Sequence, residues 1–94
     1  MNSIISQAKQ CYVCGCKSNL HLHHISFGKN RKNADKDGLT CYLCWGHHEG
    51  TYGVHGKHGH ELDMQLKKIA QYKWCERNKK DADKFIERYH QWYY

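Results

Sequence analysis

The sequence predicts a small α+β fold in which a two-stranded hairpin precedes C-terminal helices. Two short β-prone runs flank a polar stretch between residues 20 and 43, and apolar residues recur at helical spacing from about residue 61. A chain of 94 residues fits one domain with a modest core of its own. We therefore expect a single domain over residues 1–94, with its core structure in residues 11–60 and helices in residues 61–94.

The first half has the pattern of a hairpin with a long connection. Residues 1–10 predict a short, weakly helical or loose lead-in. Residues 20–26 alternate between apolar and polar types, which predicts a strand with Leu20, Leu22 and His24 on one face. Residues 28–38 are rich in Gly, Asn and Asp and predict a polar loop, and residues 39–43 predict the partner strand. Residues 44–49 can start a helix, which a glycine-rich segment then interrupts.

The second half predicts two helices. Leu62, Leu66, Ile69, Ala70 and Trp74 follow the spacing of a buried stripe. A break is expected at residues 78–80, after which Asp81 is a suitable N-cap. The last helix would carry a second set of apolar residues, namely Phe85, Ile86, Tyr89 and Trp92.

The charge of the chain favours an anionic partner. Fifteen Lys and Arg residues against nine Asp and Glu give a net charge of +6, which favours polyanions and nucleic acid above all. The alternative is a basic surface that serves solubility alone. A cluster of cations in residues 29–36 favours phosphate contacts, for which we select Arg31 and Lys32. No membrane-length apolar run and no secretion-signal pattern occur, so we expect a soluble cytoplasmic protein without a membrane partner.

The cysteines and histidines indicate metal. Six cysteines without a secretion signal argue against disulfides, and nine histidines beside them favour metal ligation over simple buried thiols. The run Cys11-Tyr-Val-Cys14-Gly15 has the form of a zinc knuckle, in which a tight turn aims two thiolates at one ion. Spacing alone leaves the second ligand pair open between Cys41-x2-Cys44 and Cys44-x2-His47.

Two histidine pairs suggest a second kind of chemistry. His23 and His24 end the first predicted strand, where neighbouring side chains point to opposite sides. One imidazole could therefore bind a metal while the other remains free to accept a proton. Hydrolysis of a phosphodiester requires such a pair: a cation against the phosphate oxygens and a base that activates water.

These residues resemble the HNH endonucleases, whose fold is a ββα-metal hairpin and helix. The resemblance rests on His23-His24 followed by Cys44-x2-His47-His48, and it extends over nearly the whole chain. The subgroup that it indicates is the short HNH-like proteins encoded by phages and prophages of bacteria. Further segments that fit this subgroup are Cys11–Gly15, His23-His24-Ile25, Phe27-Gly28, Asn30-Arg31-Lys32, Gly38-Leu39, Tyr42-Leu43-Cys44, Gly53-Val54-His55-Gly56 and Glu61-Leu62-Asp63.

The resemblance implies a metal-dependent DNA endonuclease that hydrolyses or nicks phosphodiester bonds. It implies that His24 is the general base and that His48 opens the helix of the motif. The ligands of the catalytic ion would be His23, His48 and His55. The ligands of a structural zinc would be Cys11, Cys14, Cys44 and His47. Imidazole ligands favour Zn²⁺, Ni²⁺ or Mn²⁺ over Mg²⁺ for the second divalent ion.

The chain departs from the family at one position. The family has an Asn that orients the base just before the second strand, where this chain reads Asp37-Gly38-Leu39. This departure leaves room for a different residue to hold the base. It also supports an alternative, a non-catalytic zinc-stabilised module that binds DNA or a protein.

Overall fold

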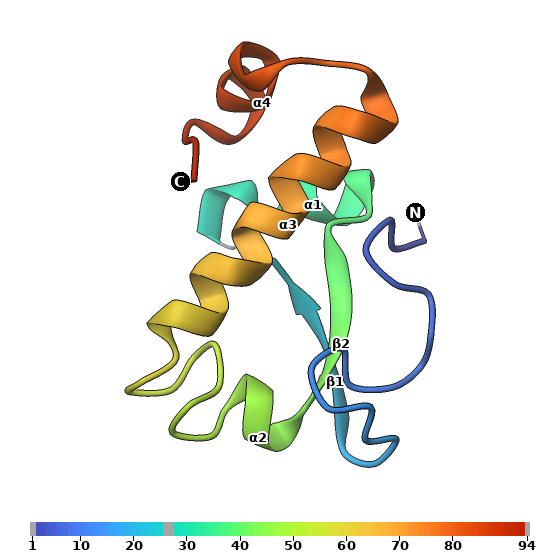
Figure 1. Ribbon diagram of the computed structural model, residues 1–94, viewed down its shortest axis with the longest axis vertical. Helices are drawn as coiled ribbons and strands as arrows, with labels where there is room; N and C mark the ends of the chain where they lie inside the picture. The colour runs from blue at the N-terminus through green and yellow to red at the C-terminus, as the bar shows by residue number, and fades with distance from the viewer. Residues whose placement is uncertain (1, 26–27, 94) are drawn as a thin grey trace.

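The computed structural model describes residues 2–25 and 28–93. In chain order its elements are β1 (Leu20–His24), η1 (Gly28–Asn30), α1 (Arg31–Asp37), β2 (Thr40–Cys44), α2 (Trp45–His48), α3 (His60–Asn78) and α4 (Ala82–Tyr89). The two strands pair antiparallel (Figure 1). The predicted α+β arrangement, a hairpin followed by C-terminal helices, is therefore confirmed.

The hairpin differs from the prediction mainly at its ends. Leu20 lies opposite Cys44 and His24 lies opposite Thr40, so the first strand ends at His24. The expected extension of the strand to residue 26 lies outside the described residues, although Ile25 N still donates to Leu39 O at 2.9 Å. In the short helix that follows β2, His48 is the last residue. The expectation that His48 opens this helix is wrong.

The polar loop predicted for residues 28–38 is also wrong, because this segment forms η1 and α1. Ala34 is fully buried, and its carbonyl accepts a hydrogen bond from Leu39 N at 2.8 Å. Gly38 ends the helix in the left-handed conformation with φ of 76°, which glycine adopts at little cost. One buried residue in a seven-residue helix produces no periodic pattern, and this explains why the composition suggested a loop.

The stripe predicted for the long helix is confirmed. Leu66, Ala70 and Trp74 are buried on α3, and Leu62 and Ile69 pack beside them. They share one core with buried residues of the hairpin region, namely Ile25, Leu39, Cys41 and Leu43. The apolar face of α3 therefore covers the sheet, which is too small to bury its own side chains.

The predicted helix break and cap are confirmed at the start of α4. Lys79 takes the left-handed conformation after α3, and Asp81 Oδ1 accepts a hydrogen bond from Lys84 N at 3.1 Å. The predicted stripe of α4 is only partly correct. Ile86 is 39% exposed, and Trp92 lies beyond the helix, where its ring packs edge-on against Phe85.

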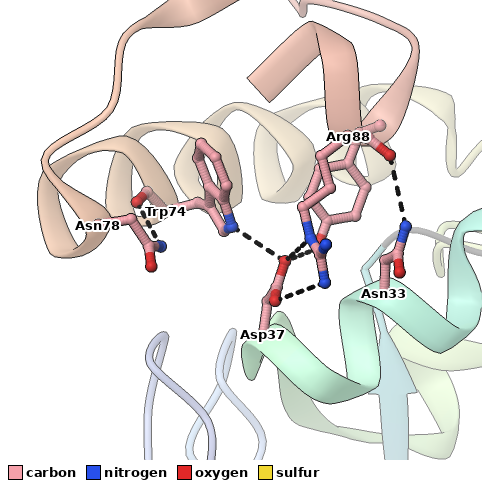
Figure 2. A network of polar contacts seen from close by, with 6 residues as sticks. Asn33, Asp37, Trp74, Asn78 and Arg88 are labelled. Atoms are coloured by element: carbon pink, nitrogen blue, oxygen red, sulfur yellow. Dashed lines mark hydrogen bonds and ion pairs between the residues drawn. The ribbon is translucent and has the colours of Figure 1, made fainter. Parts of the chain in front are cut away.

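A carboxylate on α1 ties the C-terminal helices to the hairpin region. Figure 2 shows Asp37 at the end of α1, facing Trp74 of α3 and Arg88 of α4. Asp37 accepts hydrogen bonds from Trp74 Nε1 at 2.9 Å, from Arg88 Nε and Nη2 at 2.5 and 2.9 Å, and from Tyr89 Oη at 2.5 Å. The position of α1 is thus fixed by contacts from both C-terminal helices.

The helices in the described ranges differ from the stretch of about 20 predominantly apolar residues that a bilayer-spanning helix needs. None of them is long and apolar enough to cross a membrane. The longest, α3, has 19 residues, but its charged side chains rule it out as a span.

Candidate metal centres

Three cysteines and a histidine meet where the N-terminal knuckle contacts the end of the hairpin. Cys11 and Cys14 come from the knuckle, Cys44 ends β2, and His47 lies on α2. Their four potential ligand atoms all lie within 4.8 Å of one another. A backbone hydrogen bond from Tyr12 N to the β2 residue 42 carbonyl, 2.9 Å long, holds the knuckle against the strand.

The distances within this cluster fit one tetrahedral ion. Zinc with Zn–S bonds of about 2.3 Å and a Zn–N bond of about 2.0 Å would place sulfur atoms about 3.8 Å apart and sulfur and nitrogen about 3.5 Å apart. Cys14 Sγ lies 3.9 Å from Cys44 Sγ. His47 Nδ1 lies 3.6 Å from Cys11 Sγ and 3.3 Å from Cys44 Sγ. These four residues could therefore hold a metal ion without rearrangement.

Three thiols in and beside this cluster have shifted pKa values. A backbone hydrogen bond with Cys16 lowers the pKa of Cys14, but burial and the thiols of Cys11 and Cys44 raise it more. Burial raises the pKa of Cys11, but backbone hydrogen bonds, the largest from Cys44, lower it more, to about 6. A thiolate is the form that binds metal. Burial raises the pKa of Cys41 to about 12, and Cys41 belongs to none of the metal-ligand clusters found in the described residues. The geometry thus favours His47 over Cys41 as the fourth ligand.

A second cluster consists of three histidines. His23 on β1, His48 on α2 and His55 in the following segment bring ligand nitrogens within 4.8 Å of one another. His55 is placed by two backbone hydrogen bonds to α2, from Val54 N to His47 O at 2.9 Å and from His55 N to His48 O at 3.0 Å.

The glycines that interrupt regular structure after α2 have a packing role. A Cβ atom on any of four glycines would lie within 2.7 Å of backbone atoms, and these are Gly50, Gly53, Gly56 and Gly59. Only glycine permits such close approach of one turn to the next. The glycine-rich segment is therefore a tight coil that returns His55 to the sheet, and the sequence showed it only as a breaker.

The histidine rings are arranged as they would be around one ion. Their centres lie 5.3 Å apart for His23 and His48, 5.5 Å for His23 and His55, and 4.7 Å for His48 and His55. With metal–nitrogen bonds of about 2.1 Å, imidazole rings around a tetrahedral ion have centres about 5 Å apart. The three planes are steeply inclined to one another, by 68° to 83°, so the rings do not stack.

Burial and neighbouring charge favour the neutral form of two of these imidazoles, His23 and His48. Burial, followed by the charge of His48 and then of His55, lowers the pKa of His23 to about 3. Burial likewise lowers the pKa of His48. A neutral imidazole has a lone pair to offer a metal, so neither His23 nor His48 needs to release a proton to bind an ion at neutral pH.

His48 also has two neighbours that the sequence analysis missed. Its Nδ1 lies 2.9 Å from His21 Nδ1 and 3.2 Å from Glu49 Oε1, and these three residues form a further potential ligand group. In metal sites, a ligand histidine is often hydrogen-bonded through its other ring nitrogen to a carboxylate or another polar group. His21 and Glu49 could orient His48 in this way. The available signal was the period of two in β1, which puts His21 on the same face as His23.

His24 faces a different part of the molecule. It lines a hollow of about 520 Å³ together with Arg31, Lys32 and Asp35 of α1. Its Nε2 lies 3.1 Å from Asp35 Oδ1. His24 and His23 thus occupy opposite sides of β1, as their adjacency predicts, with two cations near His24 and two imidazoles near His23.

The comparisons with known proteins do not assign a family: no family model, curated protein or solved structure matches this chain. The two clusters and the hollow beside them therefore carry the functional inference.

Proposed function

We propose that this chain is a metal-dependent DNA endonuclease of the HNH type, in which β1, β2 and α2 form a ββα-metal arrangement. The observation that supports this proposal most is that two adjacent histidines at the end of β1 have different surroundings. His23 joins two imidazoles at a potential ion site, and the next residue, His24, opens into a hollow lined by two cations. Neighbouring Cα atoms are about 3.8 Å apart, so a phosphate bound across the end of β1 would lie between the ion on one side of the strand and the His24 imidazole on the other.

The residues of the hollow have complementary tasks. Arg31 and Lys32 would bind the non-bridging oxygens of the scissile phosphate or of its neighbour. His24 would remove a proton from water as the water oxygen bonds to phosphorus and the bond from phosphorus to the leaving sugar oxygen breaks. The leaving oxygen then takes up a proton. An ion held by the three histidines would stabilise the negative charge that develops on the phosphate oxygens.

The cysteine-containing cluster would serve structure in this scheme. Structural zinc contributes about 10–16 kcal/mol of apparent binding free energy in small zinc domains, which is of the same order as the total stability of about 5–15 kcal/mol typical of a domain. Its ligand His47 immediately precedes His48 of the histidine cluster on α2. Zinc at the first site would therefore also fix a ligand of the second.

One observation favours a second candidate, a zinc-stabilised module that binds DNA or protein without cleaving it. The cluster of three cysteines and one histidine has the donor set and spacing of a purely structural site. Such a module would use the basic surface but would need neither His24 nor the three clustered imidazoles.

Cleavage of supercoiled plasmid distinguishes the two candidates. Protein that retains one equivalent of zinc, but has been freed of weakly bound ions, would receive Mg²⁺, Mn²⁺, Ni²⁺ or Zn²⁺. We expect wild-type cleavage with at least one of these ions and a loss of about 10²-fold or more in His24→Ala, because positioned general bases contribute about 10²- to 10⁴-fold.

Two controls make this result interpretable. His60→Ala changes an exposed histidine outside both clusters and should cleave like wild type. Zinc content and circular dichroism should be equal in all three proteins. DNA binding without cleavage under every metal would refute the nuclease and support the binding module.

A further inference from the structure

We propose that Asp35 is the positioning residue of His24, holding its imidazole in one tautomer and one orientation. This inference rests on the proposed role of His24 as general base. It assigns a task to a carboxylate that the sequence analysis did not select.

The contact fixes which nitrogen of His24 is available. Asp35 Oδ1 lies 3.1 Å from His24 Nε2, and an ionised carboxylate can only accept a hydrogen bond. The contact therefore requires the proton of the neutral imidazole to be on Nε2. Nδ1 is then left with its lone pair, so it is the nitrogen that would accept the proton of water.

The carboxylate is held by a well-anchored helix. Its neighbour Ala34 is fully buried, and the Asp35 carbonyl itself accepts from Gly38 N where α1 ends. Two residues further along, Asp37 binds Arg88 and the other donors described above. Asp35 thus approaches His24 from a rigid element, which is the requirement for an orienting group.

Stability alone does not account for this contact. The side chains of His24 and Asp35 are 13% and 65% exposed, and exposed pairs contribute only about 0.2–1 kcal/mol. The backbone around His24 is already fixed by its pairing with Thr40 and by the bond from Ile25 N to Leu39 O. The main consequence of the carboxylate is therefore on the imidazole and not on the fold.

The tautomer can be measured directly by long-range ¹⁵N correlation spectra of the imidazole nitrogens, with His24 assigned from its missing signal in His24→Gln. We expect the Nε2–H form in wild type, a mixture of both tautomers in Asp35→Ala, and the Nε2–H form again in Asp35→Glu, which restores an acceptor. Glu87→Ala is the matched control, because Glu87 is also an exposed carboxylate in an ion pair, with Lys84. An unchanged tautomer in Asp35→Ala would overturn the inference.

Cleavage provides the second readout. Asp35→Ala should lower kcat by about tenfold with KM unchanged, a part of the about 10²- to 10⁴-fold that a positioned base contributes, and Asp35→Glu should recover most of it. Equal kcat in Asp35→Ala and wild type would refute the positioning role. If the wild type fails to cleave DNA with any of the four metals, the proposed nuclease activity is refuted. The tautomer spectra still decide whether Asp35 fixes the orientation of His24.

Discussion

Removal of the Asp37 carboxylate is the sharpest test of how the helices are held together. Asp37→Ala deletes an acceptor shared by Trp74, Arg88 and Tyr89. These donors come from α3 and α4, whereas Asp37 itself ends α1, so no other side chain in Figure 2 links all three helices. The substitution therefore separates the contribution of this network from that of the apolar core.

The expected cost follows from what each donor loses. A hydrogen bond to a charged group contributes about 1.5–3 kcal/mol when shielded from water. The Arg88 side chain is 34% exposed and can turn to solvent, so its share is discounted to about 1 kcal/mol. The indole of Trp74 and the hydroxyl of Tyr89 lie on buried residues, but their bonds to Asp37 are only partly shielded from water, so each would lose about 1 kcal/mol. The sum is about 3 kcal/mol.

Thermal and urea unfolding at saturating zinc would measure this loss. For a chain of this size about 1 kcal/mol corresponds to 4–8 °C in Tm, so we expect a decrease of about 12–24 °C. Glu87→Ala, which removes one exposed ion pair at 3.4 Å, should change stability by less than about 0.5 kcal/mol. A loss below about 1 kcal/mol in Asp37→Ala would show that the network contributes little and that apolar contacts alone dock α4.

Three further predictions concern the turn, the metal and the pH dependence. Gly38→Ala should destabilise by about 2 kcal/mol or more, because φ is 76° and the new Cβ would lie 2.4 Å from a backbone oxygen of the N-terminal segment. Gly46→Ala should not, because its new Cβ would make only an ordinary van der Waals contact, 3.9 Å from Cys44 Sγ. Cys14→Ser should reduce zinc content by one equivalent and weaken Mn²⁺ or Ni²⁺ binding by the histidines, whereas Cys75→Ser should leave both unchanged in mass spectrometry and calorimetry. Burial lowers the pKa of His23 to about 3 in the folded protein, against about 6.5 in the unfolded chain. Below about pH 6.5 the unfolded chain therefore binds a proton that the folded protein does not, and the free energy of unfolding should fall by about 1.4 kcal/mol per pH unit. In urea unfolding between pH 7.5 and 5.5, His23→Asn should show a shallower dependence than wild type, and equal slopes would contradict the assignment.

The elements with strong local signals were predictable from the sequence. Leu66, Ala70 and Trp74 recur at helical spacing, and a long helix needs no information from distant residues to show its buried face. Asp81 combines a good cap residue with a break before it, and the structure places its carboxylate on the Lys84 N–H as expected. The knuckle around Cys11 was equally visible because its ligands are close in sequence.

The features that were missed depend on contacts between distant segments. Helix α1 is stabilised by the Asp37 network and by the burial of Ala34, and neither is visible in a run of polar residues. The choice of His47 over Cys41 as a ligand depends on which side of β2 faces the knuckle, because both spacings suit zinc. Asp35 is eleven residues from His24, and only the return of α1 to the strand brings the two together.

The short helix α2 connects the two potential ion sites through adjacent residues. Successive residues on a helix point about 100° apart, so His47 can turn toward the cysteines while His48 turns toward His23 and His55. A four-residue helix makes too few internal hydrogen bonds to be stable alone. Its conformation must therefore come from its contacts, of which an ion at the cysteine cluster would be the strongest. It follows that the geometry of the histidine cluster is set in part by the neighbouring site, and that the two sites should lose their ions in a fixed order, the histidine cluster first.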